Sequence, residues 1–131
     1  TMARLAEIDV CAFGVSLEKP HRFLFDDPAT RGVMLCAGKE RIGYAYIGAG
    51  GHVGPLAVMP VHSLRNAFAT ALKLAADGSA ETVSAFLPGT CDSALSLAID
   101  QGMRITFPML LMASPGYGDW RQYLPRNPGF M

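Results

Sequence analysis

The stretch from Gly43 to Val58 constrains the fold of this chain more than any other. An apolar, β-favouring run at 44–47 is followed by a glycine-rich segment at 48–51 and by a second extended run at 52–58. Glycine reaches positive φ without a clash from a Cβ atom, so the middle segment can reverse the chain direction tightly. The pattern predicts two strands joined by a short turn.

The second of these strands contains the pair Gly54-Pro55. Proline has no N–H group to donate to a neighbouring strand, so the pair predicts a bulge or a splay at this point. Backbone amides beyond it would then be free for a ligand. A helical pattern begins directly after Pro60, and the end of a strand followed by the start of a helix is a ligand-binding arrangement in many α/β folds.

The remaining chain predicts alternating helices and strands. Residues 4–13 read as a helix, 21–26 as a short helix or turn, and 31–37 and 41–47 as a hairpin. A helix after Pro60 carries an apolar stripe at helical spacing and ends at Asp77-Gly78; the stripe comprises Leu64, Ala67, Phe68, Ala71, Leu72 and Ala75. A strand at 82–87, a helix starting at Thr90 or Asp92 and ending at Gly102, and a long strand at 103–113 follow. Hairpins together with strand–helix–strand crossovers predict an α/β fold with a mixed sheet.

Composition limits the number of domains and the kinds of partner. The 131 residues suit a single domain spanning 1–131, with 50% hydrophobic residues and no net charge. This balance argues against nucleic acid or a membrane as partners and predicts an apolar interface, from a homodimer or a companion domain. Three widely spaced cysteines and the absence of a visible signal peptide favour a cytoplasmic protein.

Two segments resemble the GNAT superfamily of acetyl-CoA N-acyltransferases. The sequence from Gly54 to Val58, followed by Met59-Pro60 and a helix, is similar to the acyl-CoA-binding segment of that family. The stretch 86–103 resembles a second GNAT segment, which it matches at Ala94, Leu97 and Gly102. The chain looks most like the C-terminal GNAT-like domain of tandem two-domain acetyltransferases, and the first GNAT strand is missing.

The resemblance implies a mostly antiparallel mixed sheet with a splayed central strand and helices on both faces. It also implies acetyl-CoA as co-substrate, with the pantetheine arm along Leu56, Ala57 and Val58. The pyrophosphate would lie at the helix N-terminus, where backbone amides attract anions; the residues there are Ser63, Leu64, Arg65 and Asn66. The chain departs from the family where Ser63, Asn66 and Phe68 occupy the phosphate-loop positions, which lack their glycines, and where Ala98 replaces a tyrosine.

His52 and Tyr117 are the candidate catalytic residues. Histidine titrates near neutral pH, so His52 could accept a proton as a general base, or it could be a loop residue without a role. In GNAT enzymes a tyrosine at the position of Ala98 usually acts as the general acid. Tyr117 could take over that role, or it could anchor the tail. The histidines and cysteines show no ligand spacing, so no metal is expected.

Two functions remain open from the sequence. The first is an N-acetyltransferase that transfers an acetyl group from acetyl-CoA to an amine of a small molecule or protein. The second is a degenerate, non-catalytic GNAT-fold module that serves dimerisation or regulates a partner domain. Phe68, Cys91 and Ala98 at family motif positions favour the second.

Overall fold

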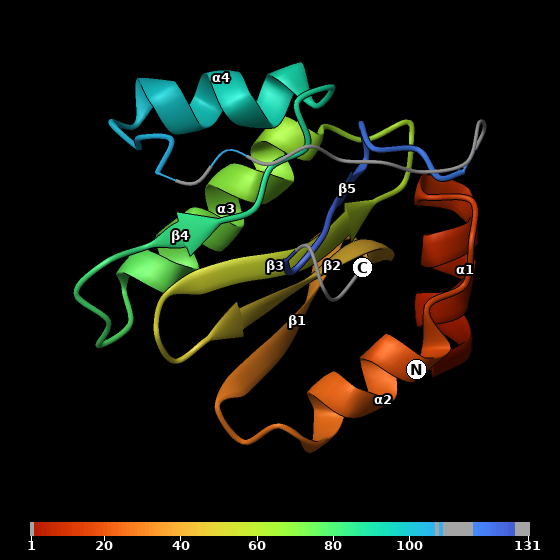
Figure 1. Cartoon of the computed structure of the whole chain (residues 1–131). Helices are drawn as coiled ribbons and strands as arrows, with labels where there is room; N and C mark the ends of the chain where they lie inside the picture. Colours follow the sequence, from red (N-terminus) through yellow and green to blue (C-terminus); the bar gives the residue numbers. More distant parts are fainter. Residues whose placement is uncertain (1, 107, 109–116, 128–131) are drawn as a thin grey trace.

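The computed structural model describes residues 2–106, 108 and 117–127 (Figure 1). The chain begins with two helices, α1 (Met2–Ala12) and α2 (Glu18–Asp26). In α1, Leu5, Ile8 and Ala12 recur at helical spacing and are all buried. This stripe turns α1 toward the sheet, because burying apolar side chains is the main favourable contribution to packing.

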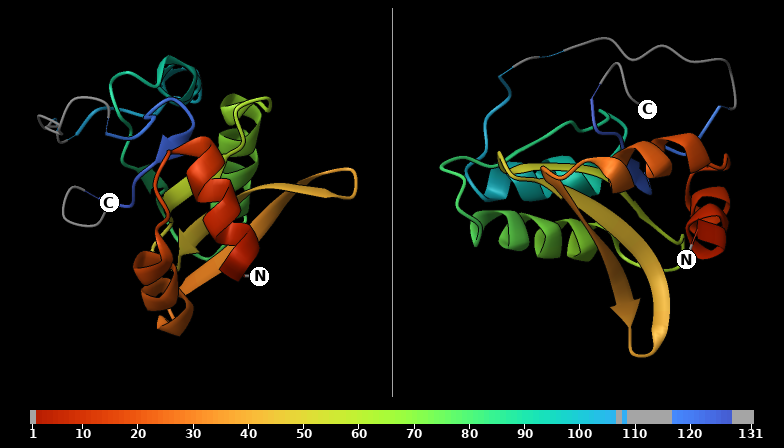
Figure 2. Two further views of the ribbon diagram at one scale, coloured as in Figure 1. Left: turned by 90° about the vertical axis from the view of Figure 1, so that its right-hand side faces the viewer. Right: turned by 90° about the horizontal axis from the view of Figure 1, so that it is seen from below.

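Three strands form a continuous antiparallel meander: β1 (Thr30–Ala37), β2 (Glu40–Gly48) and β3 (His52–Val58). The predicted hairpin and the predicted end of the central strand at Val58 are both confirmed. The β1–β2 hairpin projects beyond the rest of the sheet (Figure 2). Within the described residues β1 pairs with β2 alone, so its outer edge is open.

The second edge of β3 is shared by two short strands. β4 (Ser84–Ala85) runs parallel to β3 and pairs with His52 and Val53. β5 (Tyr123–Leu124) runs antiparallel and pairs with Leu56 and Ala57. The two halves of one strand edge are therefore paired to segments that lie about forty residues apart in the sequence.

The Gly54-Pro55 pair forms the bulge that the sequence predicts. Ala45 lies opposite Leu56, whereas Ile47 lies opposite Val53, so β3 carries one more residue than β2 over this interval. Gly54 has φ +140°, a conformation that glycine accepts because it has no Cβ. The Gly54–Pro55 peptide is cis.

Helices cover both faces of the sheet, as Figure 1 shows. On one face lie α3 (Leu64–Ala76) and α4 (Asp92–Asp100), whose apolar stripes pack with β2 and β3 around the buried Leu56 and Phe68. On the other face α1 and α2 pack over a cluster that includes Tyr44, Tyr46 and Tyr123. The fold is thus a mixed α/β sandwich with a mostly antiparallel open sheet.

Two expectations for the second half of the chain need correction, and the tail adds one strand that no pattern predicts. The strand expected at 82–87 is reduced to Ser84–Ala85. Residues 103–106 form no strand, and most of the remainder of the strand expected at 103–113 lies outside the described residues. The tail, which shows no periodicity in sequence, contributes β5. A two-residue strand is too short for a period-2 pattern to reveal it, so tertiary pairing alone defines β4 and β5.

Candidate functional site

The backbone edge of β3 beyond the bulge is where the sequence places the pantetheine arm. Leu56, Ala57 and Val58 are completely buried. The expectation that their amides are free fails, because the tail covers this edge. The Val58 N–H donates to the Gln122 carbonyl at 3.1 Å, and β5 pairs with the two preceding residues.

Gln122 also closes the turn between β3 and α3. Its Nε2 group donates to the carbonyl oxygens of Val58, Met59 and His62 at 3.1, 3.2 and 3.2 Å. Val58 ends β3, and Met59 and His62 lie in the turn before α3, where the Met59 carbonyl also accepts from the His62 N–H at 2.9 Å. One side chain from the tail therefore stabilises the segment that would face a cofactor.

The N-terminus of α3 begins with a side-chain cap. Ser63 accepts a hydrogen bond from the Asn66 N–H at 3.1 Å, which satisfies one of the amides that a helix start leaves unpaired. Leu64 is buried in the core. Arg65 forms an ion pair with Asp100 at 3.1 Å, and both side chains are well exposed. This pair links α3 to α4 at a position that an anion could also reach.

Phe68 belongs to the core. Its side chain has no exposed area and packs in the cluster between α3, α4 and the sheet. The interpretation of Phe68 as a core residue is therefore confirmed. The ring does not lie over the helix start, where it would obstruct a phosphate group.

His52 is held by two hydrogen bonds. Its Nε2 lies 2.5 Å from the Arg126 carbonyl and its Nδ1 lies 2.9 Å from the Ser84 hydroxyl. A carbonyl oxygen can only accept, so Nε2 carries the proton, and in the neutral ring Nδ1 accepts from Ser84. The lone pair that a general base needs is thus engaged by β4.

Tyr117 packs beside the end of α1 and takes part in neither of the hydrogen bonds that hold His52. Its ring packs edge-on against Phe13 with centroids 5.7 Å apart, while the next residue but one, Asp119, donates its N–H to the Phe13 carbonyl. These contacts support the interpretation of Tyr117 as an anchor of the tail on α1. They do not bring it to the partners of His52.

A buried polar cluster on the α1–α2 face escaped the sequence analysis. Asp9 and His21 are 0% and 1% exposed, and His21 Nε2 donates to Asp9 Oδ2 at 2.9 Å. Asp9 also accepts from the Tyr44 hydroxyl at 2.6 Å and from the Leu17 N–H at 3.0 Å. The Tyr46 hydroxyl lies 2.7 Å from His21 Nδ1. Asp9 lies on the buried stripe of α1, which is the one signal in the sequence that could have indicated it.

Burial changes the acidity of the phenols around this cluster. It raises the pKa of Tyr44 and of Tyr46 above the usual value for tyrosine, and the negative charge of Asp9 acts in the same direction. Tyr123 has a raised pKa for the same two reasons. All three phenols therefore remain neutral at physiological pH, and the hydroxyls of Tyr44 and Tyr46 serve as hydrogen-bonding groups of a structural network.

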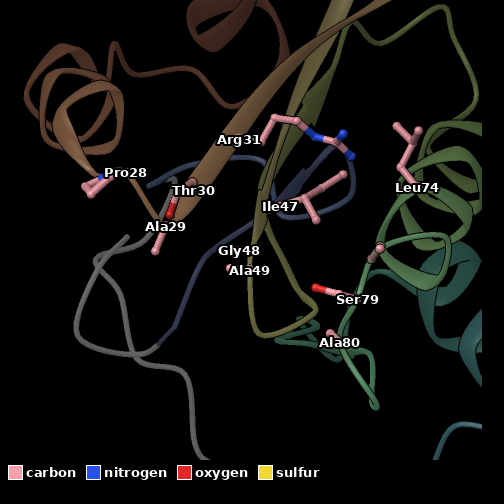
Figure 3. A pocket seen from close by; sticks show the side chains of 12 residues that line it. Pro28, Ala29, Thr30, Arg31, Ile47, Gly48, Ala49, Leu74, Ser79 and Ala80 are labelled. Carbon is pink, nitrogen blue, oxygen red and sulfur yellow. The ribbon is translucent and has the colours of Figure 1, made fainter.

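A separate hollow of about 250 Å³ lies at the opposite end of α3 from Ser63. Arg31 and Ser79 extend polar groups beside Ile47 and Leu74 in this hollow (Figure 3). None of the expected site residues is among those that line it. The hollow therefore does not coincide with the site that the sequence indicates.

Comparisons of the chain with protein-family models, with curated proteins and with solved structures find no match. Within the described residues, no helix is long and apolar enough to cross a membrane. In the same part of the chain, no group of three or more His, Cys, Asp or Glu side chains is arranged to hold a metal ion.

Proposed function

We propose that this chain is an acetyl-CoA-dependent N-acyltransferase domain of the GNAT type. The observation that supports the proposal most directly is the interruption of β3. Beyond the Gly54 bulge, the strand leaves β4 and runs into the capped start of α3. This places a strand edge and a helix N-terminus in line, which suits an extended ligand with an anionic end.

The reaction would be a direct transfer between the two substrates. The acceptor amine attacks the thioester carbon, the C–N bond forms, the C–S bond breaks, and the CoA thiolate leaves. The amine proton passes to water, or to His52 Nδ1 once the Ser84 hydroxyl has left it, and the thiolate takes a proton from solvent. The acceptor is an amine of a small molecule or of a protein.

A ligand-binding measurement tests this proposal. Ligand that binds only the folded state raises stability by about 2.7 kcal/mol at a concentration one hundred times its Kd. We expect acetyl-CoA to raise the melting temperature of the chain, while ATP, which shares the polyphosphate but lacks the pantetheine arm, does not. Absence of any shift with millimolar acetyl-CoA would contradict acyltransferase function.

A second candidate is a non-catalytic module of the same fold that forms a homodimer or stabilises a companion domain. Its support is the tail, which covers the β3 edge and holds the His52 ring. The open outer edge of β1 offers a place for such a partner, since an unpaired edge can accept another strand. A dimer that binds no acetyl-CoA would favour this candidate.

A further inference from the structure

We propose that residues 122–126, named here the C-terminal strap, regulate access to the β3 edge by occupying it in the absence of acetyl-CoA. This inference rests on the proposed acyltransferase function. It makes the described conformation the closed form of the domain. Opening requires the strap to leave β3 while the rest of the sheet remains intact.

The strap contacts β3 at its C-terminal end, in its middle and, through the His52 side chain, at its N-terminal end. At its first residue, Gln122 accepts from the Val58 N–H and donates to three carbonyls around the start of α3. In the middle, β5 pairs with Leu56 and Ala57. At its last residue, Arg126 accepts from His52 through its carbonyl. The same five residues therefore cover the expected pantetheine edge and hold the candidate base.

The bulge is shaped to receive the strap. A Cβ atom added to Gly54 would lie 2.8 Å from the carbonyl oxygen of Pro125, closer than such atoms approach one another in proteins. Glycine at this position thus permits backbone-to-backbone contact with the strap. The sequence feature that predicts a ligand-binding bulge is filled here by the protein's own chain.

The pantetheine arm and the strap compete because they present the same chemistry. Both are extended chains whose amide carbonyls can accept from the N–H groups of a strand edge. The Val58 N–H has a single proton, so it cannot serve Gln122 and a pantetheine carbonyl together with full strength. Bound acetyl-CoA and the closed strap therefore exclude one another at this edge.

The closed form dominates in the free protein. Tyr123 and Leu124 are 1% and 0% exposed, so opening brings two large apolar side chains into contact with water. When the binding-competent form is a small fraction of the molecules, the apparent Kd rises in inverse proportion to that fraction. Weakening the strap should therefore tighten acetyl-CoA binding without any change to the residues of the cofactor edge.

The first test weakens the strap. Gln122→Ala removes the three side-chain hydrogen bonds and leaves the β5 pairing in place. We expect calorimetry to show acetyl-CoA binding at least about tenfold tighter than in the unmodified chain. Gln101→Ala, an exposed glutamine at the end of α4, serves as the matched control and should bind like the unmodified chain.

The second test locks the strap with a disulfide. The hydrogen bond between Val58 and Gln122 makes Ala57 and Tyr123 a non-hydrogen-bonded pair, in which antiparallel residues lie closest and a disulfide can form. In a Cys11→Ser/Cys36→Ser background, we expect oxidised Ala57→Cys/Tyr123→Cys to lose acetyl-CoA binding and reduction to restore it. The reduced and oxidised forms of one variant control for the loss of the tyrosine ring.

The possible outcomes distinguish a failure of the strap proposal from a failure of the acyltransferase proposal. If the unmodified chain, Gln122→Ala and the oxidised Ala57→Cys/Tyr123→Cys variant bind acetyl-CoA with equal affinity, the proposed role of the strap is wrong. The acyltransferase proposal is then unaffected. Absence of binding in every variant, with native circular dichroism, would overturn both. Faster amide hydrogen exchange at residues 122–124 upon addition of acetyl-CoA to the unmodified chain would support opening, and unchanged exchange despite saturating binding would contradict it.

Discussion

The buried carboxylate of Asp9 holds the α1–α2 face together, and its removal should destabilise the protein severely. Asp9 lies on α1 and accepts from Tyr44 on β2, from His21 on α2 and from the Leu17 N–H that precedes α2. Asp9→Ala leaves these three donors in a water-excluded site without an acceptor. Every described buried side-chain nitrogen and oxygen has a partner in the intact protein, so this loss is not masked by an existing defect.

The expected magnitude follows from the burial of the group. Each buried donor left without an acceptor costs about 1–3 kcal/mol, and the three losses do not add in full because the donors belong to one network, so we expect a total of about 3–5 kcal/mol. A domain of this kind has a total stability of about 5–15 kcal/mol. Asp9→Ala should therefore remove a large part of the stability and leave a protein that is folded only marginally.

Urea denaturation followed by circular dichroism measures this effect. We expect the unfolding midpoint to fall by roughly 2 M, given a urea dependence of about 1–3 kcal/mol per molar. Asp26→Ala, which removes an exposed carboxylate from the last turn of α2, should change stability by less than about 0.5 kcal/mol. Asp9→Asn should lower the free energy of unfolding less than Asp9→Ala does. The asparagine oxygen can still accept hydrogen bonds, and the Tyr44 hydroxyl can accept from the asparagine amide.

A double-mutant cycle tests the network itself. If Asp9 and His21 act together, Asp9→Ala and His21→Ala should show a coupling energy above about 1 kcal/mol. If Asp9→Ala lowers the free energy of unfolding no more than Asp26→Ala does, Asp9 does not hold the α1–α2 face together. Such a result would mean that water or a shifted side chain satisfies the three donors.

Three further predictions follow from burial and from the open sheet edge. Phe68→Ala should cost about 3–5 kcal/mol in chemical denaturation, and Phe68→Gly should not bind acetyl-CoA more tightly; tenfold tighter binding by a folded Phe68→Gly variant would contradict the core position. Light scattering should show a dimer of the isolated chain through the open β1 edge, and a monomer at high concentration would count against it. The stability that the neutral phenols contribute should be complete below about pH 10 and should fall as the pH rises toward their elevated folded-state pKa values, because the phenols of the unfolded chain ionise first. The free energy of unfolding should fall by up to roughly 4 kcal/mol per pH unit for three phenols. Urea midpoints that stay constant up to about pH 11 would contradict this. The phenols concerned are Tyr44, Tyr46 and Tyr123.

Local pattern determined a large part of the fold. The glycine-rich turn and the β-favouring runs around it specify the β2–β3 hairpin, and Gly54-Pro55 specifies the bulge, because these features depend on backbone sterics within a few residues. The apolar stripe of α3 likewise identified its buried face, including Phe68. Such features are readable from sequence since neighbours along the chain cause them.

Contacts between residues far apart in the sequence decided the remaining features of the fold. Most of the candidate site depends on such contacts. Nothing near Gln122 in the sequence indicates that it lies against Val58, and nothing near Asp9 indicates that its carboxylate meets Tyr44. The tail therefore appeared featureless in sequence although it closes the β3 edge. Short strands and buried polar pairs gain their stability from partners that are dozens of residues away, so only the tertiary structure shows which edge is filled and which charge is satisfied.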